Sequence, residues 1–215
     1  MTLERVDADP DVRTTVSEPL ASALAAARDA ARTADRLVLV EGPSDRAALE
    51  ALADQQGRSL AAERVSVVAM GGITNVAWFL EALRPYDVQL AGLCDAGEER
   101  YVVRGLGRVG ITDVDSRADR EAHGFFTCVA DMEDELIRAL GTAAVELVLE
   151  AEGELTSYRL FQQQPAQRER TAVEQLHRFM GTRSMRKIRY GRLLVEALDP
   201  ERAPRPLVGA LAPAA

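Results

Sequence analysis

Short apolar runs alternate with helical patterns along the first two thirds of the chain. Four runs have the length and the Val and Leu content of buried strands, and they cover residues 37–40, 65–70, 88–93 and 125–129. The segments between them place apolar side chains at helical spacing, most clearly over residues 44–55, 74–83 and 98–106. Short buried strands separated by helices predict an α/β fold, with a parallel sheet of about four strands flanked by helices.

Helical patterns also flank this α/β segment on both sides. Residues 1 to about 14 are expected to be a frayed lead-in, and an alanine-rich helix is predicted over residues 17–33. After residue 133 the strand signals stop, and residues 134–153 and 167–198 read as helices.

The predicted helices 134–153 and 167–198 are joined by a Gln-rich stretch that a proline interrupts. The tail, from Pro200 to Ala215, is rich in Pro and Ala and is expected to end in a short docked helix or coil. We therefore expect three parts: an N-terminal lead-in and helix (1–34), an α/β domain (35–140) and a C-terminal helical region (141–215).

Acidic residues follow three of the four predicted strands. Glu41 follows the first strand, with Asp45 one helical turn later, and Asp95 follows the third. Asp131 and Glu133 follow the fourth. Because the carboxyl ends of parallel strands share one edge, where ligands bind in open α/β sheets, these five carboxylates are expected to converge. Clustered oxygen ligands suit Mg²⁺ or Mn²⁺, so one or two such ions are the expected cofactors.

A purely structural role for these acids is the alternative. A carboxylate after a strand often caps the next helix, because the helix N-terminus favours negative charge. Capping explains any single one of these acids as well as metal binding does, but agreement at three strand ends favours a shared site. His123 and His177 lie outside the acidic motifs, and no zinc-type spacing accompanies them.

The overall composition is that of an ordinary globular protein, with 47% hydrophobic and 28% charged residues among 215. The net charge of −8 gives no whole-surface attraction to nucleic acid, so any contact requires a local basic patch. No apolar run approaches the ~18 residues that span a bilayer, and the amino terminus lacks the features of a secretory signal. A cytoplasmic protein without membrane contact is therefore expected.

One local basic patch surrounds the only lysine of the chain, Lys187. Five cations fall within residues 183–192, with no acid among them. The patch consists of Arg183, Arg186, Lys187, Arg189 and Arg192. It would hold a phosphate backbone next to the acidic site, and the equally weighted alternative is a solvated helix face.

Together these motifs resemble a TOPRIM domain, the fold of topoisomerases, bacterial primases and OLD-family (overcoming lysogenization defect) nucleases. The segments that carry the resemblance are Leu37-Val38-Leu39-Val40-Glu41-Gly42-Pro43-Ser44-Asp45, Met70-Gly71-Gly72, Leu93-Cys94-Asp95 and Asp131-Met132-Glu133. They lie within about residues 35–140, and the downstream helix with Lys187 makes the OLD-type branch the most similar one.

The resemblance implies a TOPRIM (Rossmann-like) sheet and a role for each motif residue. Glu41 would be a metal ligand or general base, and Lys187 would contact the scissile phosphate or stabilise developing charge. The other implied metal ligands are Asp45, Asp95, Asp131 and Glu133. The implied activity is metal-dependent phosphoryl transfer, most simply DNA endonuclease cleavage, with the arginines of the basic patch binding the nucleic acid.

Two departures from the family pattern qualify this interpretation. The Asp-x-Asp motif reads Asp95-Ala96-Gly97, so its second acid is missing unless Glu98 or Glu99 substitutes. The chain also has no phosphate-binding Gly-x-x-x-x-Gly-Lys loop, so ATP hydrolysis by this chain is not expected. A separate ATPase chain and a homodimer stay open as partners. The alternative functions are a catalytically degenerate binding or regulatory module and an RNA-processing TOPRIM nuclease.

Overall fold

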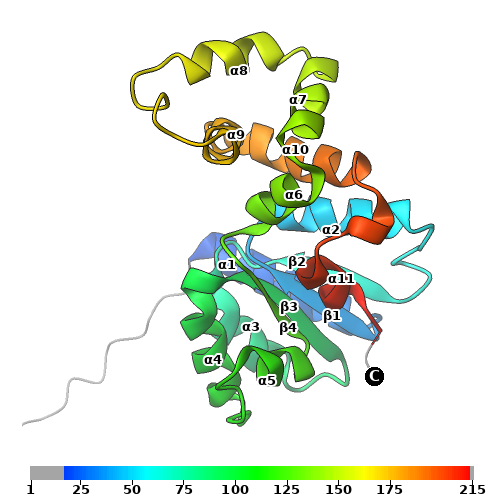
Figure 1. The fold of residues 1–215 in the computed structure, drawn as a ribbon. Coiled ribbons are helices and arrows are strands. Elements are labelled where there is room, and N and C mark those ends of the chain that lie inside the picture. The colour runs from blue at the N-terminus through cyan, green and yellow to red at the C-terminus, as the bar shows by residue number, and fades with distance from the viewer. Residues whose placement is uncertain (1–16, 214–215) are drawn as a thin grey trace, which may run out of the picture.

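A computed structural model describes residues 17–213 and places a parallel sheet at the centre of the molecule (Figure 1). Its strands are β1 (Arg36–Val40), β2 (Val65–Ala69), β3 (Gln89–Asp95) and β4 (Phe125–Cys128). Their order in the sheet is β2-β1-β3-β4, and every pair is parallel. The predicted α/β fold is thus confirmed, with strand bounds within two residues of those expected. The expected lead-in lies outside the described residues.

Two hydrophobic cores, one on each face, hold the helices against the sheet. Side chains along β1 alternate between them, because successive residues of a strand point to opposite faces. Leu37 and Leu39 pack with helices α1 (Glu18–Ala31), α3 (Val76–Leu83) and α4 (Glu99–Arg108). Val38 and Val40 pack on the other face, with α2 (Pro43–Gln55) and helices from the C-terminal half of the chain.

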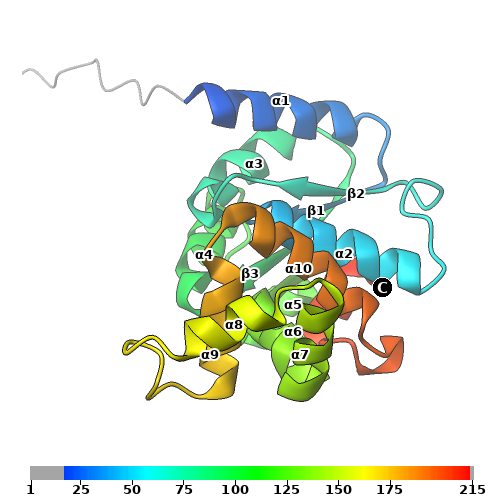
Figure 2. The same cartoon turned by 90° about the horizontal axis from the view of Figure 1, so that it is seen from above.

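The C-terminal half forms a helical layer that extends beyond the sheet (Figure 1). Its helices are α6 (Met132–Leu140), α7 (Thr142–Ala151), α8 (Leu155–Gln162), α9 (Ala172–Gly181) and α10 (Ser184–Glu196). Seen from above, α10 lies along α2, and the contacts between these two helices are extensive (Figure 2). This packing returns the segment around Lys187 to the sheet.

The prediction of one continuous helix over residues 134–153 and another over 167–198 is wrong, because each segment forms two helices. Gly141 ends the first piece with a φ of 82°, a conformation that favours glycine over other residues. The second pattern begins only at α9, where Thr171 caps the helix and accepts a hydrogen bond from the Glu174 amide. It then breaks at Thr182 and Arg183, before α10. Apolar periodicity continues across both breaks and so conceals them.

Several short elements complete the fold. Helix α5 (Arg117–Ala122) was not predicted, and it begins with a capping box between Ser116 and Asp119. Three single-turn 3₁₀ segments are η1 (Ile73–Asn75), η2 (Ala96–Glu98) and η3 (Pro200–Arg202). None of the helices in the described part of the chain has the length and apolar character that a membrane crossing requires.

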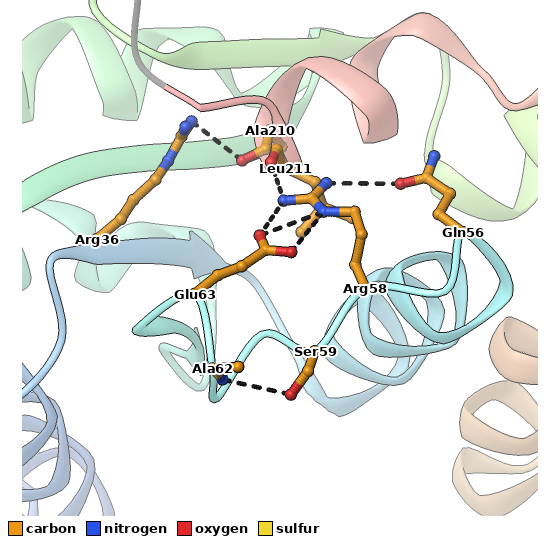
Figure 3. Close-up of polar contacts among 8 residues, drawn as sticks. All are labelled: Arg36, Gln56, Arg58, Ser59, Ala62, Glu63, Ala210 and Leu211. Atoms are coloured by element: carbon orange, nitrogen blue, oxygen red, sulfur yellow. Dashed lines mark hydrogen bonds and ion pairs between the residues drawn. The ribbon is translucent and has the colours of Figure 1, made fainter.

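The tail docks as helix α11 (Arg205–Leu211), as expected for this segment. Two arginines hold the carbonyl oxygens at its C-terminal end (Figure 3). Arg36 Nη2 donates to the Ala210 oxygen at 3.2 Å, and Arg58 Nη2 donates to the Leu211 oxygen at 3.0 Å. Cations at this position are favourable, because a helix C-terminus carries partial negative charge.

Candidate metal and phosphate site

The acid-bearing strands are neighbours in the sheet. Glu41 follows β1, Asp95 ends β3 and Asp131 follows β4, and β3 lies between the other two. Because all strands are parallel, these three residues emerge at one edge. The structure therefore brings together the strand ends that the sequence marked as acidic.

A first cluster is formed by Glu41, Asp95 and Glu98. One carboxylate oxygen of each lies within 4.8 Å of the others. Burial, followed by the charges of Asp131, Glu98 and other nearby acids, raises the pKa of Asp95 to about 8. The pKa of Glu98 is also raised, by burial and then by the charge of Glu41. The acids of the first cluster therefore disfavour one another's ionised forms, and a bound cation would offset this repulsion.

Glu98 supplies a carboxylate beside Asp95, one residue after Gly97, which stands where the Asp-x-Asp pattern has its second acid. The 3₁₀ turn η2 follows β3 directly and places Glu98 in the first cluster. Glu99 lies elsewhere, because its Oε1 is 2.7 Å from Arg120 Nη2. Of the two possible substitutes, the structure brings only Glu98 to the site.

A second cluster is formed by Asp131, Glu133 and His177. Each offers one ligand atom within 4.8 Å of the others. His177 Nε2 lies 2.5 Å from Asp131 Oδ2, and Asp131 Oδ1 accepts a hydrogen bond from the Asp134 amide at 2.9 Å. Asp131 therefore caps α6 with one oxygen and presents the other to the cluster, so the capping and metal-binding interpretations are compatible.

The ionisation of the Asp131–His177 pair follows from this contact. Burial alone would raise the pKa of Asp131, but the hydrogen bonds from His177 and the Asp134 amide outweigh it and lower that pKa. The same hydrogen bond raises the pKa of His177, against the opposing effect of burial. His177 was not predicted as a site residue, because 46 residues separate it from Asp131 and no local motif marks it.

Asp45 lies close to both clusters. Its Oδ2 accepts a hydrogen bond from the Gly42 amide at 2.8 Å, which caps α2. Burial raises the pKa of Asp45, and the charges of Glu41 and Asp131 add to this effect, whereas the Gly42 hydrogen bond and Lys187 oppose it. All five predicted acids are therefore found at this edge of the sheet.

Buried carboxylate oxygens without partners are the clearest sign of a cation site. Glu133 is only 2% exposed; among the described residues its Oε1 has no hydrogen-bond partner, and its Oε2 has only the Lys187 ammonium 3.3 Å away. Glu98 Oε2 is buried and unpartnered in the same way. Buried acceptors in folded proteins normally have a hydrogen-bond partner, and a bound ion can satisfy them where the protein supplies none.

Lys187 faces the second cluster from α10. Its Nζ lies 3.3 Å from Glu133 Oε2, and its side chain is 42% exposed. Burial would lower the pKa of Lys187, but the charge of Glu133, with those of Asp45 and Asp131, raises it. Lys187 is therefore a cation held at the acidic edge, with part of its side chain open to solvent.

Three of the four arginines of the basic patch have partners within the chain. Arg186 Nε lies 2.8 Å from Glu154, and its guanidinium stacks 4.2 Å from the centre of the Phe179 ring. Arg189 pairs with Glu154 at 2.6 Å and with Glu152 at 3.3 Å, and Arg192 pairs with Glu196 at 2.6 Å. Arg183 is exposed at the start of α10. Arg186 and Arg189 thus tie α10 to the turn between α7 and α8, and the role of the patch in nucleic-acid binding stays a prediction.

The donor set fits a hard divalent cation. Carboxylate oxygens make up all of the first cluster, and the second adds a single imidazole nitrogen. Mg²⁺ and Mn²⁺ prefer such oxygen-rich sites, whereas structural zinc sites use mostly thiolate and imidazole. These clusters could hold one or two ions.

Comparisons with known proteins agree with this fold. Residues 33–96 match the family model described as "Overcoming lysogenization defect protein-like, TOPRIM domain". The C-terminal region of the Burkholderia pseudomallei OLD protein aligns with a TM-score of 0.62 and 18% identity, over 83% of this chain and 95% of that one. The C-terminal region of the Xanthomonas campestris pv. campestris OLD protein gives 0.64 and 21%, over 83% and 90%. No curated protein matches this chain.

Proposed function

We propose that this protein, whose TOPRIM domain resembles that of OLD proteins, is a metal-dependent phosphoryl-transfer enzyme that cleaves DNA. The observation that carries this proposal is the meeting of acids from three strand ends around two clusters, with a lysine beside them. Acids gathered in this way repel one another without cations, so their presence at one edge of the sheet favours metal binding.

The metal ligands in this proposal come from both clusters. Glu41, Asp95 and Glu98 would hold one ion. Asp131 and Glu133 would hold a second, with His177 beside them as the hydrogen-bond donor to Asp131. Asp45, whose Oδ2 accepts the hydrogen bond from Gly42, would offer its Oδ1 as a further ligand to either ion. A bound Mg²⁺ or Mn²⁺ would supply a water of lowered pKa and stabilise charge on the reacting phosphate.

The chain's own residues would position the phosphate. Lys187 Nζ lies 3.3 Å from Glu133 of the second cluster on a partly exposed side chain, and its ammonium would donate to a non-bridging phosphate oxygen. His177 would keep Asp131 ionised and oriented through their hydrogen bond. Glu41 would act as a ligand or accept a proton from the attacking water. Arg183, which is exposed at the start of α10, would contact the DNA backbone next to the reacting phosphate.

A binding or regulatory module without catalysis is the second candidate, and Gly97 is the residue that favours it. Glycine occupies the position of the second acid, so catalysis depends on Glu98 replacing it. Calorimetry separates the two candidates, because the catalytic proposal requires divalent-metal binding and an absence of it would support the module. RNA as substrate, a separate ATPase chain and a homodimer stay predictions.

Cleavage by the purified protein tests the proposal. Supercoiled plasmid and linear DNA would be incubated with Mg²⁺ or Mn²⁺ and compared among wild type, Glu41→Ala and Lys187→Ala. Glu50→Ala is the matched control, because Glu50 lies on α2 like Asp45 but pairs with Arg46 at 2.7 Å. We expect loss of about 100-fold or more in rate for Glu41→Ala and Lys187→Ala and little change for the control. Equal activity in all variants would refute the residue assignment.

A further inference from the structure

A buried arginine lies at the edge of the sheet opposite the acidic clusters. Arg36 opens β1 and is only 7% exposed. Its Nη2 donates to the Ala210 carbonyl (Figure 3), but among residues 17–213 its Nε and Nη1 have no hydrogen-bond partner. Burying a charge without a partner costs free energy, so this guanidinium requires a counter-charge.

The acids near Arg36 are already paired with other arginines. Glu63 is bound by Arg58 at 2.6 Å (Figure 3). At the same end of the sheet, Asp35 pairs with Arg64 at 3.1 Å, and Glu121 pairs with Arg205. Burial, and then the charge of Arg58, lower the pKa of Arg36 from its usual value. No carboxylate in the described part of the chain therefore neutralises it.

A cavity of about 480 Å³ opens beside Arg36. It lies between the amino ends of β3 and β4 and helix α11, and its lining includes Gln89, His123, Phe126 and Gly209. Glu121, the acid in its lining, is already paired with Arg205. A second cavity, of about 430 Å³, also borders Arg36. Its lining contains Asp35 and Glu63 beside a second arginine, Arg58, whose guanidinium is already bound by Glu63 and the Leu211 carbonyl. The first cavity is thus the more favourable place for negative charge.

We propose that Arg36 and this first cavity bind a small oxyanion, a phosphate or a carboxylate. A guanidinium donates several hydrogen bonds in one plane, which match the acceptor oxygens of such ions. The site is at the amino ends of the strands, so it is separate from the acidic clusters at their carboxyl ends. Because α11 forms one wall and also holds Arg36 through Ala210, bound anion would stabilise the docking of α11.

Thermal unfolding in EDTA tests this site without interference from divalent metals. Inorganic phosphate or acetate would be titrated at constant ionic strength against wild type, Arg36→Met and Arg64→Met. Methionine keeps a long side chain at position 36 but removes the charge, and Arg64 is the exposed control at the same end of the sheet. We expect the wild-type and Arg64→Met midpoints to rise by roughly 5–10 °C at a hundredfold excess over Kd. Arg36→Met is expected not to respond.

The two anions distinguish the classes of ligand. A response to phosphate alone assigns a phosphate-type ligand, and a response to acetate assigns carboxylates. No response to either anion, or an equal response in Arg36→Met, would overturn the proposal. A tungstate soak of wild-type crystals gives a second measurement should Arg36→Met fail to fold, with an anomalous peak expected beside Arg36. Tungstate bound elsewhere and absent from this cavity would also overturn it.

Discussion

Gly191 of α10 lies directly against the backbone of Ser44 in α2. A Cβ atom built on Gly191 would be 2.8 Å from the Ser44 carbonyl oxygen, which is closer than real Cβ contacts allow. Lys187 is one helical turn before Gly191, and Asp45 immediately follows Ser44. The absence of a side chain at position 191 therefore permits the close approach of two helices that bear site residues.

Replacing this glycine tests whether the close approach positions Lys187. Gly191→Ala must push α10 away from α2, which we expect to lower the free energy of unfolding by about 1–3 kcal/mol. A displacement of about 1 Å at Lys187 is expected to slow DNA cleavage by roughly 10- to 100-fold. Rates would be measured at a temperature where the variant is fully folded.

Gly107→Ala is the matched control, because Gly107 lies in α4 and its added Cβ would meet nothing within 4 Å. It is expected to stabilise the protein by roughly 0.5–1 kcal/mol and leave cleavage unchanged. Full activity in Gly191→Ala would show that the contact with Ser44 does not position the lysine.

Glu98 is expected to replace the acid that Gly97 lacks. Glu98→Ala removes one carboxylate from the first cluster, so we expect the affinity for Mn²⁺ to fall by about tenfold or more. Glu99→Ala serves as the control, because Glu99 pairs with Arg120 and does not belong to the cluster. Titration calorimetry measures both. An unchanged affinity in Glu98→Ala would exclude Glu98 as a ligand.

The pKa of about 8 at Asp95 predicts a pH dependence of metal-free stability. The folded protein holds this proton more tightly than the unfolded chain, whose Asp has a pKa near 3.8. Stability should therefore fall as pH rises from about 4 towards 8, and the loss should be complete above pH 8.

Asp95→Asn removes this effect. In EDTA at pH 8 it is expected to raise the free energy of unfolding by roughly 1–2 kcal/mol, after allowance for solvent screening, while weakening Mn²⁺ binding. Denaturant unfolding at pH 5 and pH 8 measures the first effect. A variant no more stable than wild type at pH 8 would contradict the burial of charge at Asp95.

His177 is expected to contribute to metal binding through Asp131. His177→Ala removes an imidazole from the second cluster and the hydrogen bond that keeps Asp131 ionised. We expect about 10- to 100-fold weaker Mn²⁺ binding. His123→Ala is the control, because His123 contacts the exposed Asp113, away from the acidic edge. Equal affinities for both variants would remove His177 from the site.

Local patterns were sufficient to predict the strands and their acidic ends. The predicted strands 37–40 and 88–93 are short and apolar and are followed by turn residues, so neighbouring residues in the sequence are enough to identify them. The order β2-β1-β3-β4 depends on which strands pair in space, and no local pattern in the chain specified it. This order places β1, β3 and β4, the strands that the acids follow, next to one another.

Features that depend on contacts between distant segments could not be predicted from the sequence. His177 reaches Asp131 only because α9 packs on α6. The pairing of Arg186 and Arg189 with Glu154 is likewise set by packing, so a run that reads as an exposed basic face is partly buried. The helix end at Gly141 could have been predicted, since glycine commonly ends a helix, but the apolar spacing continues on both sides of it.

The central claim is that acids from three strand ends share bound cations, and anomalous diffraction from a crystal soaked in Mn²⁺ tests it most directly. We predict a peak among Glu41, Asp95 and Glu98, a second among Asp131, Glu133 and His177, or both. A well-diffracting soaked crystal with manganese bound elsewhere and no peak at either cluster would contradict this account.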